Sequence, residues 1–255
     1  MTAPSDTPSL SIDGHVATVR LRRPGHANRL GPQDLAVLRE QLERVNADDA
    51  VRVLRFQSEG KYFCSGYDIS SLASDQAPSS LYFGQTMDLI EAARPVTIAA
   101  VQGGAYGGGT DLCLACDFRI GTPQADMFMP ATRLGLHFYA GGMSRYVARL
   151  GLDQAKRLFL TAEKLQADEM LRIGFLTELV PEETLAARLD ALSAQIAAMA
   201  PIPLFGVKAH LNRIARGELD LAGIEQAVLR SERSHDLAEG AAAWKEKRAP
   251  HFTGC

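Results

Sequence analysis

The sequence predicts an α/β protein, in which strands alternate with covering helices. "HVATVRLRRP", from His15, and "VRVLRFQSEG", from Val51, both alternate β-branched and polar residues, and each ends at a proline or glycine stop. Between them, "GPQDLAVLREQLERVNADD" has leucines at helical spacing and Pro32 near its start. A strand, a helix and a second strand in succession are typical of a sheet that packs against helices.

The same alternation continues along the chain. "PVTIAAVQGGAYGGG" predicts a buried strand that enters a glycine turn, "TDLCLACD" predicts a helix, and "FRIGT" predicts a further short strand. "DQAPSS", from Asp75, has the composition of a mobile loop. Helical periodicity is predicted over 182–212 and again from Leu219 to the tail. We therefore expect an α/β core over residues 1–195 and a helical C-terminal region over 196–255.

Composition limits the function classes. The chain has 255 residues and a net charge of -3, and no long basic run indicates nucleic-acid binding. No uninterrupted apolar run reaches the roughly 20 residues of a membrane span. Cys113 and Cys116 have CxxC spacing, but they lie in a helical apolar pattern with no second ligand pair, so a zinc or redox site is not favoured. We expect a cytoplasmic protein with no metal, nucleic-acid or membrane partner.

The segment "YGGGTDLCLACD" places three glycines, Gly107 to Gly109, in front of a predicted helix that carries Asp111. Glycine is costly inside a helix, so a triplet suggests that the backbone itself is needed there. Exposed amides at a helix start form a natural anion site. Asp111 is either a catalyst or a carboxylate that interacts with the helix dipole, and the sequence leaves both open.

Two of these segments carry a resemblance. "FCSGYDIS", residues 63–70, and "AAVQGGAYGGGTDLCLACDFRI", residues 99–120, closely resemble segments of the crotonase superfamily, the enoyl-CoA hydratase and isomerase family. The similarity extends over nearly the whole chain, including "RLRRPGHANRL" and "LFLTAEKLQADEMLRIGFLTELVP". It implies a crotonase fold, with a pair of twisted β-sheets wrapped by helices and a C-terminal helical region that in relatives builds trimers and often hexamers.

The resemblance also implies an acyl-CoA thioester as substrate, so that coenzyme A enters as part of the substrate and no separate cofactor is needed. The family's shared device is a pair of backbone amides that hold the thioester oxygen as it becomes an enolate. By motif, these amides belong to Tyr67 and Gly108. The residue types agree, because Gly66 allows close approach of the first loop and the glycine triplet places the second amide at a helix N-terminus.

Members that hydrate an enoyl double bond resemble one another in having two carboxylates. Asp111 occupies the first place in a shorter form, but Ala131 follows Pro130 where the second glutamate is expected. A methyl group neither positions water nor carries a proton. His137 and Tyr139, in "LGLHFYAGG", are alternative proton-transfer groups. His137 is equally compatible with a hydrogen bond to a buried carbonyl, and Tyr139 with an aromatic wall of the acyl pocket.

Further residues enter as contacts that the resemblance implies for the acyl-CoA. Arg22, Arg23 and His26 would meet CoA phosphates, although exposed basic residues are often only solvated. Lys247 and Phe252 match tail contacts that sometimes come from a neighbouring subunit; the alternative is a charged helix end. The remaining expected contacts of the acyl-CoA are Ser65, Asp68, Ile69, Ser70, Gly107 and Ala131.

The sequence therefore predicts an enzyme that stabilises a thioester enolate, with weak ordinary hydration. Isomerisation, decarboxylation, hydrolysis or C–C bond cleavage is favoured instead, using Asp111, His137 or Tyr139. The alternative is a catalytically silent member that holds an acyl thioester or a partner protein. Binding of thioesters without turnover would distinguish the second class from the first.

Overall fold

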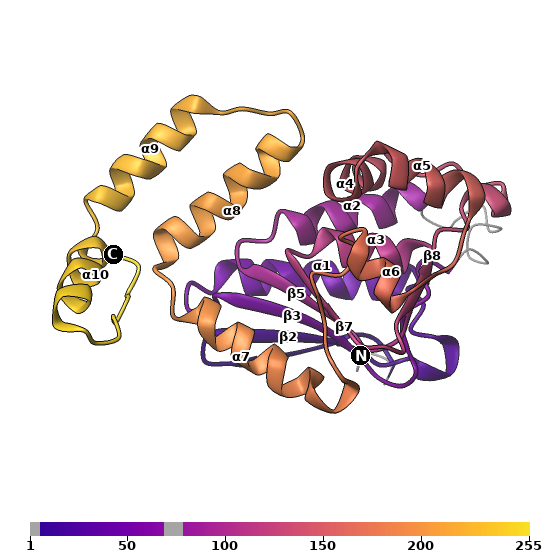
Figure 1. Cartoon of the computed structure of the whole chain (residues 1–255), viewed down its shortest axis with the longest axis horizontal. Coiled ribbons are helices and arrows are strands. Elements are labelled where there is room, and N and C mark those ends of the chain that lie inside the picture. Colours follow the sequence, from indigo (N-terminus) through magenta and orange to yellow (C-terminus); the bar gives the residue numbers. More distant parts are fainter. Residues whose placement is uncertain (1–5, 69–78) are drawn as a thin grey trace.

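The computed structural model describes residues 6–68 and 79–255. Its larger sheet has six strands in the order β1-β2-β3-β5-β7-β10, all parallel except β1 (Figure 1). These strands are β1 (Ser9–Asp13), β2 (Val16–Leu21), β3 (Val53–Ser58), β5 (Val96–Val101), β7 (Phe118–Gly121) and β10 (Glu178–Leu179). The strands predicted around His15, Val51, Pro95 and Phe118 are thereby confirmed.

A smaller sheet follows the order β4-β6-β8-β9, in which only β8 and β9 are antiparallel. Its strands are β4 (Tyr62–Cys64), β6 (Gly104–Tyr106), β8 (Asp126–Phe128) and β9 (Leu165–Gln166). The glycine-rich segment after β5 thus forms a second short strand before its helix. The two sheets and their covering helices confirm the α/β crotonase fold class.

Helices cover both faces of the larger sheet. Alternate strand residues such as Leu54 and Phe56 pack with α1 (Pro32–Ala47) on one face, whereas Val53 and its neighbours pack against α7 (Leu185–Ala197) on the other. Further helices of the core lie above and beside α1 in Figure 1. They are α2 (Ser80–Glu91), α3 (Gly108–Ala115), α4 (Ala140–Leu150), α5 (Leu152–Thr161) and α6 (Ala167–Arg172). Short 3₁₀ turns span Pro24–His26, Thr132–Leu134 and Glu182–Thr184.

The C-terminal part is helical and extends away from the core, as Figure 1 shows for α9 and α10. It contains α8 (Pro201–Ala215), α9 (Leu221–Glu232) and α10 (His235–Glu246). The helical stretch predicted over 182–212 is two helices, because Pro201 starts α8 and disfavours a helical conformation at Ala200. In the described part of the chain no single helix is long and apolar enough to span a membrane; α7 and α8 pass that test only as a pair bent by 107°.

Two predictions concern local features. Residues 75–78 of "DQAPSS" lie outside the described residues, and Ser79 caps α2 by accepting a hydrogen bond from the Leu81 amide. Cys113 and Cys116 are free, buried thiols. Burial raises the pKa of Cys116 to about 12, which suits a small core residue rather than a reactive thiol. Residues 6–68 and 79–255 hold no group of three His, Cys, Asp or Glu that could bind a metal.

Candidate active site

The site forms where two strands of the smaller sheet end side by side. β4 ends at Cys64 and leads into Gly66 and Tyr67, while β6 ends at Tyr106 and leads into α3. Gly66 has φ +88°, and a Cβ there would lie 2.5 Å from the Gly108 nitrogen. Only glycine allows the two loops to approach so closely. The backbone of the first loop therefore packs directly against the start of α3.

The two predicted amides face the same space. The Gly66 carbonyl and the Asp68 amide both hydrogen-bond to Leu30, so Tyr67, between them in the extended chain, directs its N–H to the opposite side. Gly108 is the first residue of α3, after Gly107 with φ +51°. An ideal Cβ on Gly108 would lie 3.3 Å from the Tyr67 nitrogen. This geometry suits two donors to one oxygen at a helix N-terminus.

A cavity of about 180 Å³ opens beside these amides. Its walls are mainly apolar and aromatic, and its polar side chains are few. The lining residues are Ser65, Tyr67, Ser80, Phe83, Gly107, Gly108, Met129, Pro130, Ala131, Leu134, Leu136, His137, Phe138 and Tyr139. No carboxylate is among these described lining residues. Ala131 is nearly buried in the wall, so a methyl group stands where the second glutamate was expected.

Asp111 is fully buried and does not line the cavity. Its two oxygens accept hydrogen bonds from Arg145 Nε and Nη2 at 2.8 and 2.7 Å. Arg145 Nη1 also donates to Asp88 and Glu91. Burial by itself lowers the pKa of Arg145, but the carboxylate of Asp111 raises it above its usual value. The structure therefore places Asp111 in a buried ion pair. Its catalytic role stays a prediction, and the hydrogen bonds of its side chain go to Arg145 and Tyr139.

Tyr139 lies between the cavity and that ion pair. Its ring lines the cavity, stacked on Phe138 at 4.2 Å between ring centroids, and its hydroxyl donates to Asp111 Oδ2 at 2.6 Å. Burial and the Asp111 charge both raise the pKa of Tyr139 well above its ordinary value. The phenol therefore stays protonated, and its proton points toward Asp111 rather than into the cavity.

His137 is an exposed member of the cavity wall, as is Leu134. Its Nδ1 lies 2.7 Å from the Phe138 carbonyl oxygen. Because a carbonyl only accepts, Nδ1 carries the hydrogen, and in the neutral ring Nε2 holds the lone pair. Nε2 is therefore available for proton exchange with a bound molecule. The structure brings His137, Tyr67 and Gly108 together around one cavity.

The predicted phosphate contacts have other partners. Both terminal nitrogens of Arg23 bind the Asp34 carboxylate, and Arg22 donates to the Thr7 carbonyl. Each guanidinium thus holds the loop after β2 in place. His26 is exposed. The Asp68 carboxylate is paired with Arg29 at 3.3 Å.

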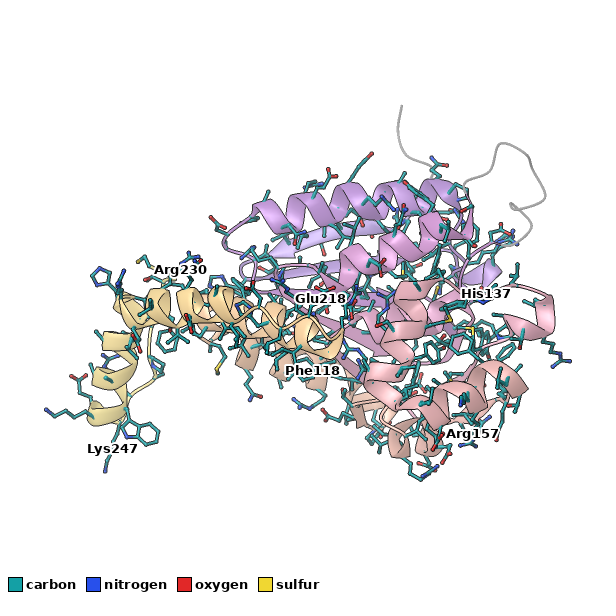
Figure 2. All side chains as sticks on the ribbon, turned by 90° about the horizontal axis from the view of Figure 1, so that it is seen from above. Phe118, His137, Arg157, Glu218, Arg230 and Lys247 are labelled. Atoms are coloured by element: carbon teal, nitrogen blue, oxygen red, sulfur yellow. The ribbon has the colours of Figure 1, made fainter. Side chains whose placement is uncertain are left out.

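Two of the predicted contacts belong to the C-terminal helices. Lys247 directly follows α10, and Figure 2 shows it on the opposite side of the molecule from His137. Phe252 follows in the tail, where its carbonyl accepts from Arg52. Within one chain, therefore, neither residue reaches the cavity. Ile69 and Ser70 lie outside the described residues.

Sequence reasoning missed Arg145 and the pair formed by Phe83 and Gly84. Arg145 stands between Gly142 and Tyr146 on the buried face of α4, and a cation on an apolar face is a signal for a buried carboxylate partner. Phe83 packs so closely on the second loop that a Cβ at Gly108 would lie 2.7 Å from its ring. No local pattern marks that contact.

The comparisons with known proteins agree with this fold. The family model described as enoyl-CoA hydratase/isomerase matches residues 11–255. Crotonyl-CoA hydratase of Syntrophomonas wolfei is 32% identical over 250 residues, covering 95% of this chain and 96% of that protein. The mitochondrial enoyl-CoA hydratase domain-containing protein 2 of Mus musculus is 37% identical, and the match covers 94% of this chain and 84% of that protein.

A solved structure of enoyl-CoA hydratase from Bacillus anthracis superposes with a TM-score of 0.89 at 30% identity, covering 98% of this chain and 100% of that one. The structure of an enoyl-CoA hydratase/carnithine racemase from Magnetospirillum magneticum superposes with a TM-score of 0.92 at 26% identity, covering 99% of this chain and 97% of that one. The fold and the family match define a crotonase-type protein. This chain belongs to the enoyl-CoA hydratase/isomerase family.

Proposed function

We propose that this protein binds an acyl-CoA thioester through the Tyr67 and Gly108 amides and forms its enolate by decarboxylation. The observation that carries the proposal is the cavity itself. Two amides converge beside it, yet no carboxylate is among its described lining residues, because Asp111 is paired with Arg145. An enolate forms by proton removal, for which His137 is the one base among the described lining residues, or by loss of CO₂, which needs no base.

The balanced step starts from an α-carboxyacyl-CoA. The bond between Cα and the carboxylate breaks, its electron pair moves into the thioester carbonyl, CO₂ leaves, and the oxygen carries the enolate charge. Donors aimed at that oxygen lower such a barrier by about 3 kcal/mol each. The apolar wall formed by Phe83, Met129 and Leu136 disfavours the charged carboxylate relative to neutral CO₂. Protonated His137 then donates a proton from Nε2 to Cα, while its Nδ1–H keeps its hydrogen bond to the Phe138 carbonyl oxygen.

The test is a panel of thioesters assayed with one enzyme preparation. Methylmalonyl-CoA reports decarboxylation, crotonyl-CoA reports hydration, and 3-hexenoyl-CoA reports isomerisation, each followed by separation of the CoA products. We expect CO₂ release from methylmalonyl-CoA and hydration at least about 100-fold slower than common enzymatic rates. Crotonyl-CoA hydration within the usual range of about 1–10³ s⁻¹ contradicts the proposal. Isomerisation without decarboxylation assigns His137 as a base instead.

A silent binding function is the second candidate, and the ion pair favours it. Two predicted proton-transfer groups, Asp111 and Tyr139, are buried and hydrogen-bonded to each other. A protein that only carries an acyl thioester needs the amides and no proton donor. Binding of butyryl-CoA in calorimetry, with no turnover of any panel member, supports this candidate over catalysis.

We also propose that the chain works as a homotrimer or homohexamer. Large apolar side chains are exposed along the C-terminal helices, including Val207, Leu211, Val228, Leu237 and Trp244. Such a surface is typical of an interface. In an oligomer, Lys247 and Phe252 could contact the CoA of a neighbouring copy. Light scattering coupled to size-exclusion chromatography should give three or six chain masses; one chain mass contradicts this.

A further inference from the structure

The inner end of the cavity is closed by one side chain. The Tyr139 ring is held at three points: its hydroxyl by Asp111, one face by Phe138, and one edge by α2. The contact with α2 depends on Gly84, because a Cβ there would lie 2.6 Å from the Tyr139 ring. Gly142 of α4 also lies against the ring, with an ideal Cβ 2.8 Å away. Two helices thus leave room for Tyr139 by omitting side chains.

The side chains on the far side of the Tyr139 ring from the cavity carry charges. The Tyr139 hydroxyl contacts Asp111, which is bound by Arg145, and Arg145 is only 1% exposed. An acyl chain that extended past the ring would have to displace Tyr139 and meet a buried guanidinium and carboxylate. Placing alkyl carbon there breaks hydrogen bonds to charged groups without replacing them. The cavity has no apolar continuation in that direction.

The space in front of the ring is small. The cavity measures about 180 Å³, and a dry cavity of about 150 Å³ holds one benzene molecule. That comparison gives room for an acyl group of roughly four to six carbons. The walls formed by Phe83, Leu136 and Phe138 are apolar, so they suit alkyl carbon up to that length.

We propose that Tyr139, seated against Gly84, sets the upper length of the acyl group, so that this protein selects short-chain acyl-CoA thioesters. This inference rests on the acyl-CoA site proposed above, but it does not depend on which reaction occurs there. Tyr139 is thus a specificity-determining residue. Gly84 determines specificity through it, because it fixes how far the ring stands from the amides.

Binding of a saturated series, from butyryl-CoA through hexanoyl-, octanoyl- and decanoyl-CoA, tests the length limit by calorimetry on the full chain. We expect wild-type affinity to rise to hexanoyl-CoA and to fall beyond it. Tyr139→Ala should move the maximum to octanoyl-CoA or longer, with about tenfold tighter binding of octanoyl-CoA for two added methylenes. Tyr139→Phe is the matched control: it keeps the ring and loses only the hydroxyl, so its maximum should stay at hexanoyl-CoA.

Gly84→Ala tests the same idea in the opposite direction. The added methyl group should push the ring toward the amides and move the maximum to butyryl-CoA. Circular dichroism on each variant verifies folding, and Gly84→Ala keeps the test decisive if Tyr139→Ala does not fold. If all chain lengths bind the wild type equally, Tyr139 sets no limit. If no acyl-CoA binds to the folded wild-type protein, the acyl-CoA site itself has been misassigned.

Discussion

The buried pair between Asp111 and Arg145 allows a stability prediction that also decides between two roles for the carboxylate. Both side chains are at most 1% exposed, and two hydrogen bonds of 2.7–2.8 Å join them. Removing one charge of a buried pair costs about 3–5 kcal/mol, because the partner charge stays buried. For Asp111→Asn we expect about 3 kcal/mol, the lower end, because Asp88 and Glu91 still contact Arg145.

For a chain of this size, each kcal/mol lowers Tm by about 2–4 °C, so Asp111→Asn should unfold about 6–12 °C below the wild type. The measurement is thermal unfolding by circular dichroism at one fixed protein concentration. Glu163→Gln is the matched control, because it removes a carboxylate from an exposed pair with Arg157 and should shift Tm far less. Combining Asp111→Leu, Arg145→Met and Tyr139→Phe should restore part of the loss, because the polar groups of Asp111 and Tyr139 are removed together with the guanidinium, and Arg216 still pairs with Asp88 and Glu91.

Turnover of the best thioester completes the experiment. If Asp111 is structural, folded Asp111→Asn keeps activity within about threefold at a temperature well below its Tm. An unchanged Tm together with a loss of activity beyond about 100-fold would falsify the ion-pair interpretation, because it would show an ionised carboxylate acting on the substrate.

Three further predictions address other parts of the molecule. Gly66→Ala adds a methyl group 2.5 Å from the second amide of the site and should abolish thioester binding in calorimetry, whereas Gly14→Ala, also at positive φ but with no atom within 4 Å, should bind normally. Ala131→Glu should not raise crotonyl-CoA hydration by more than about tenfold, since one carboxylate cannot complete the pair; a larger gain shows that a second group is available. The hydrogen bond from Arg172 lowers the pKa of Glu169 from 4.5 to about 2. The ionised Glu169 carboxylate therefore stabilises the fold fully above pH 4.5, and this stabilisation is lost as the pH falls toward 2. The difference in urea midpoint between wild type and Glu169→Gln should vanish as the pH is lowered from 4.5 to 2.

Local sequence patterns predicted the parts of the fold that depend on neighbouring residues. The alternation after His15 and Val51 marks strands whose two faces pack against different helices, and the structure confirms both. The break between α7 and α8 was missed although Pro201 signals it, because the Ala- and Leu-rich periodicity continues on both sides. Proline acts on the residue before it, so a single position overrides a long pattern.

In the candidate site, too, the sequence predicted the features that depend on local backbone requirements and missed those that depend on tertiary packing. Gly66 and the glycine triplet were informative because a close approach of two backbones requires glycine, whatever the rest of the fold does. The surroundings of Asp111 were not predictable from its own segment. Its partner Arg145 lies 34 residues further along and on another helix, and only tertiary packing decides whether the carboxylate turns toward the cavity or toward the guanidinium.

Gly84 shows why such a decision is hard to see in a sequence. A glycine inside a helix lowers stability by about 0.5–1 kcal/mol relative to alanine. No residue close to Gly84 in the sequence indicates why a glycine stands there. In the fold, the missing Cβ admits the Tyr139 ring, whose hydroxyl then holds Asp111 beside Arg145. These residues from α2, α3, α4 and the turn before α4 depend on one another. A change at Gly84 alone therefore acts on the acyl cavity, although no atom of a Gly84 side chain exists to touch a substrate.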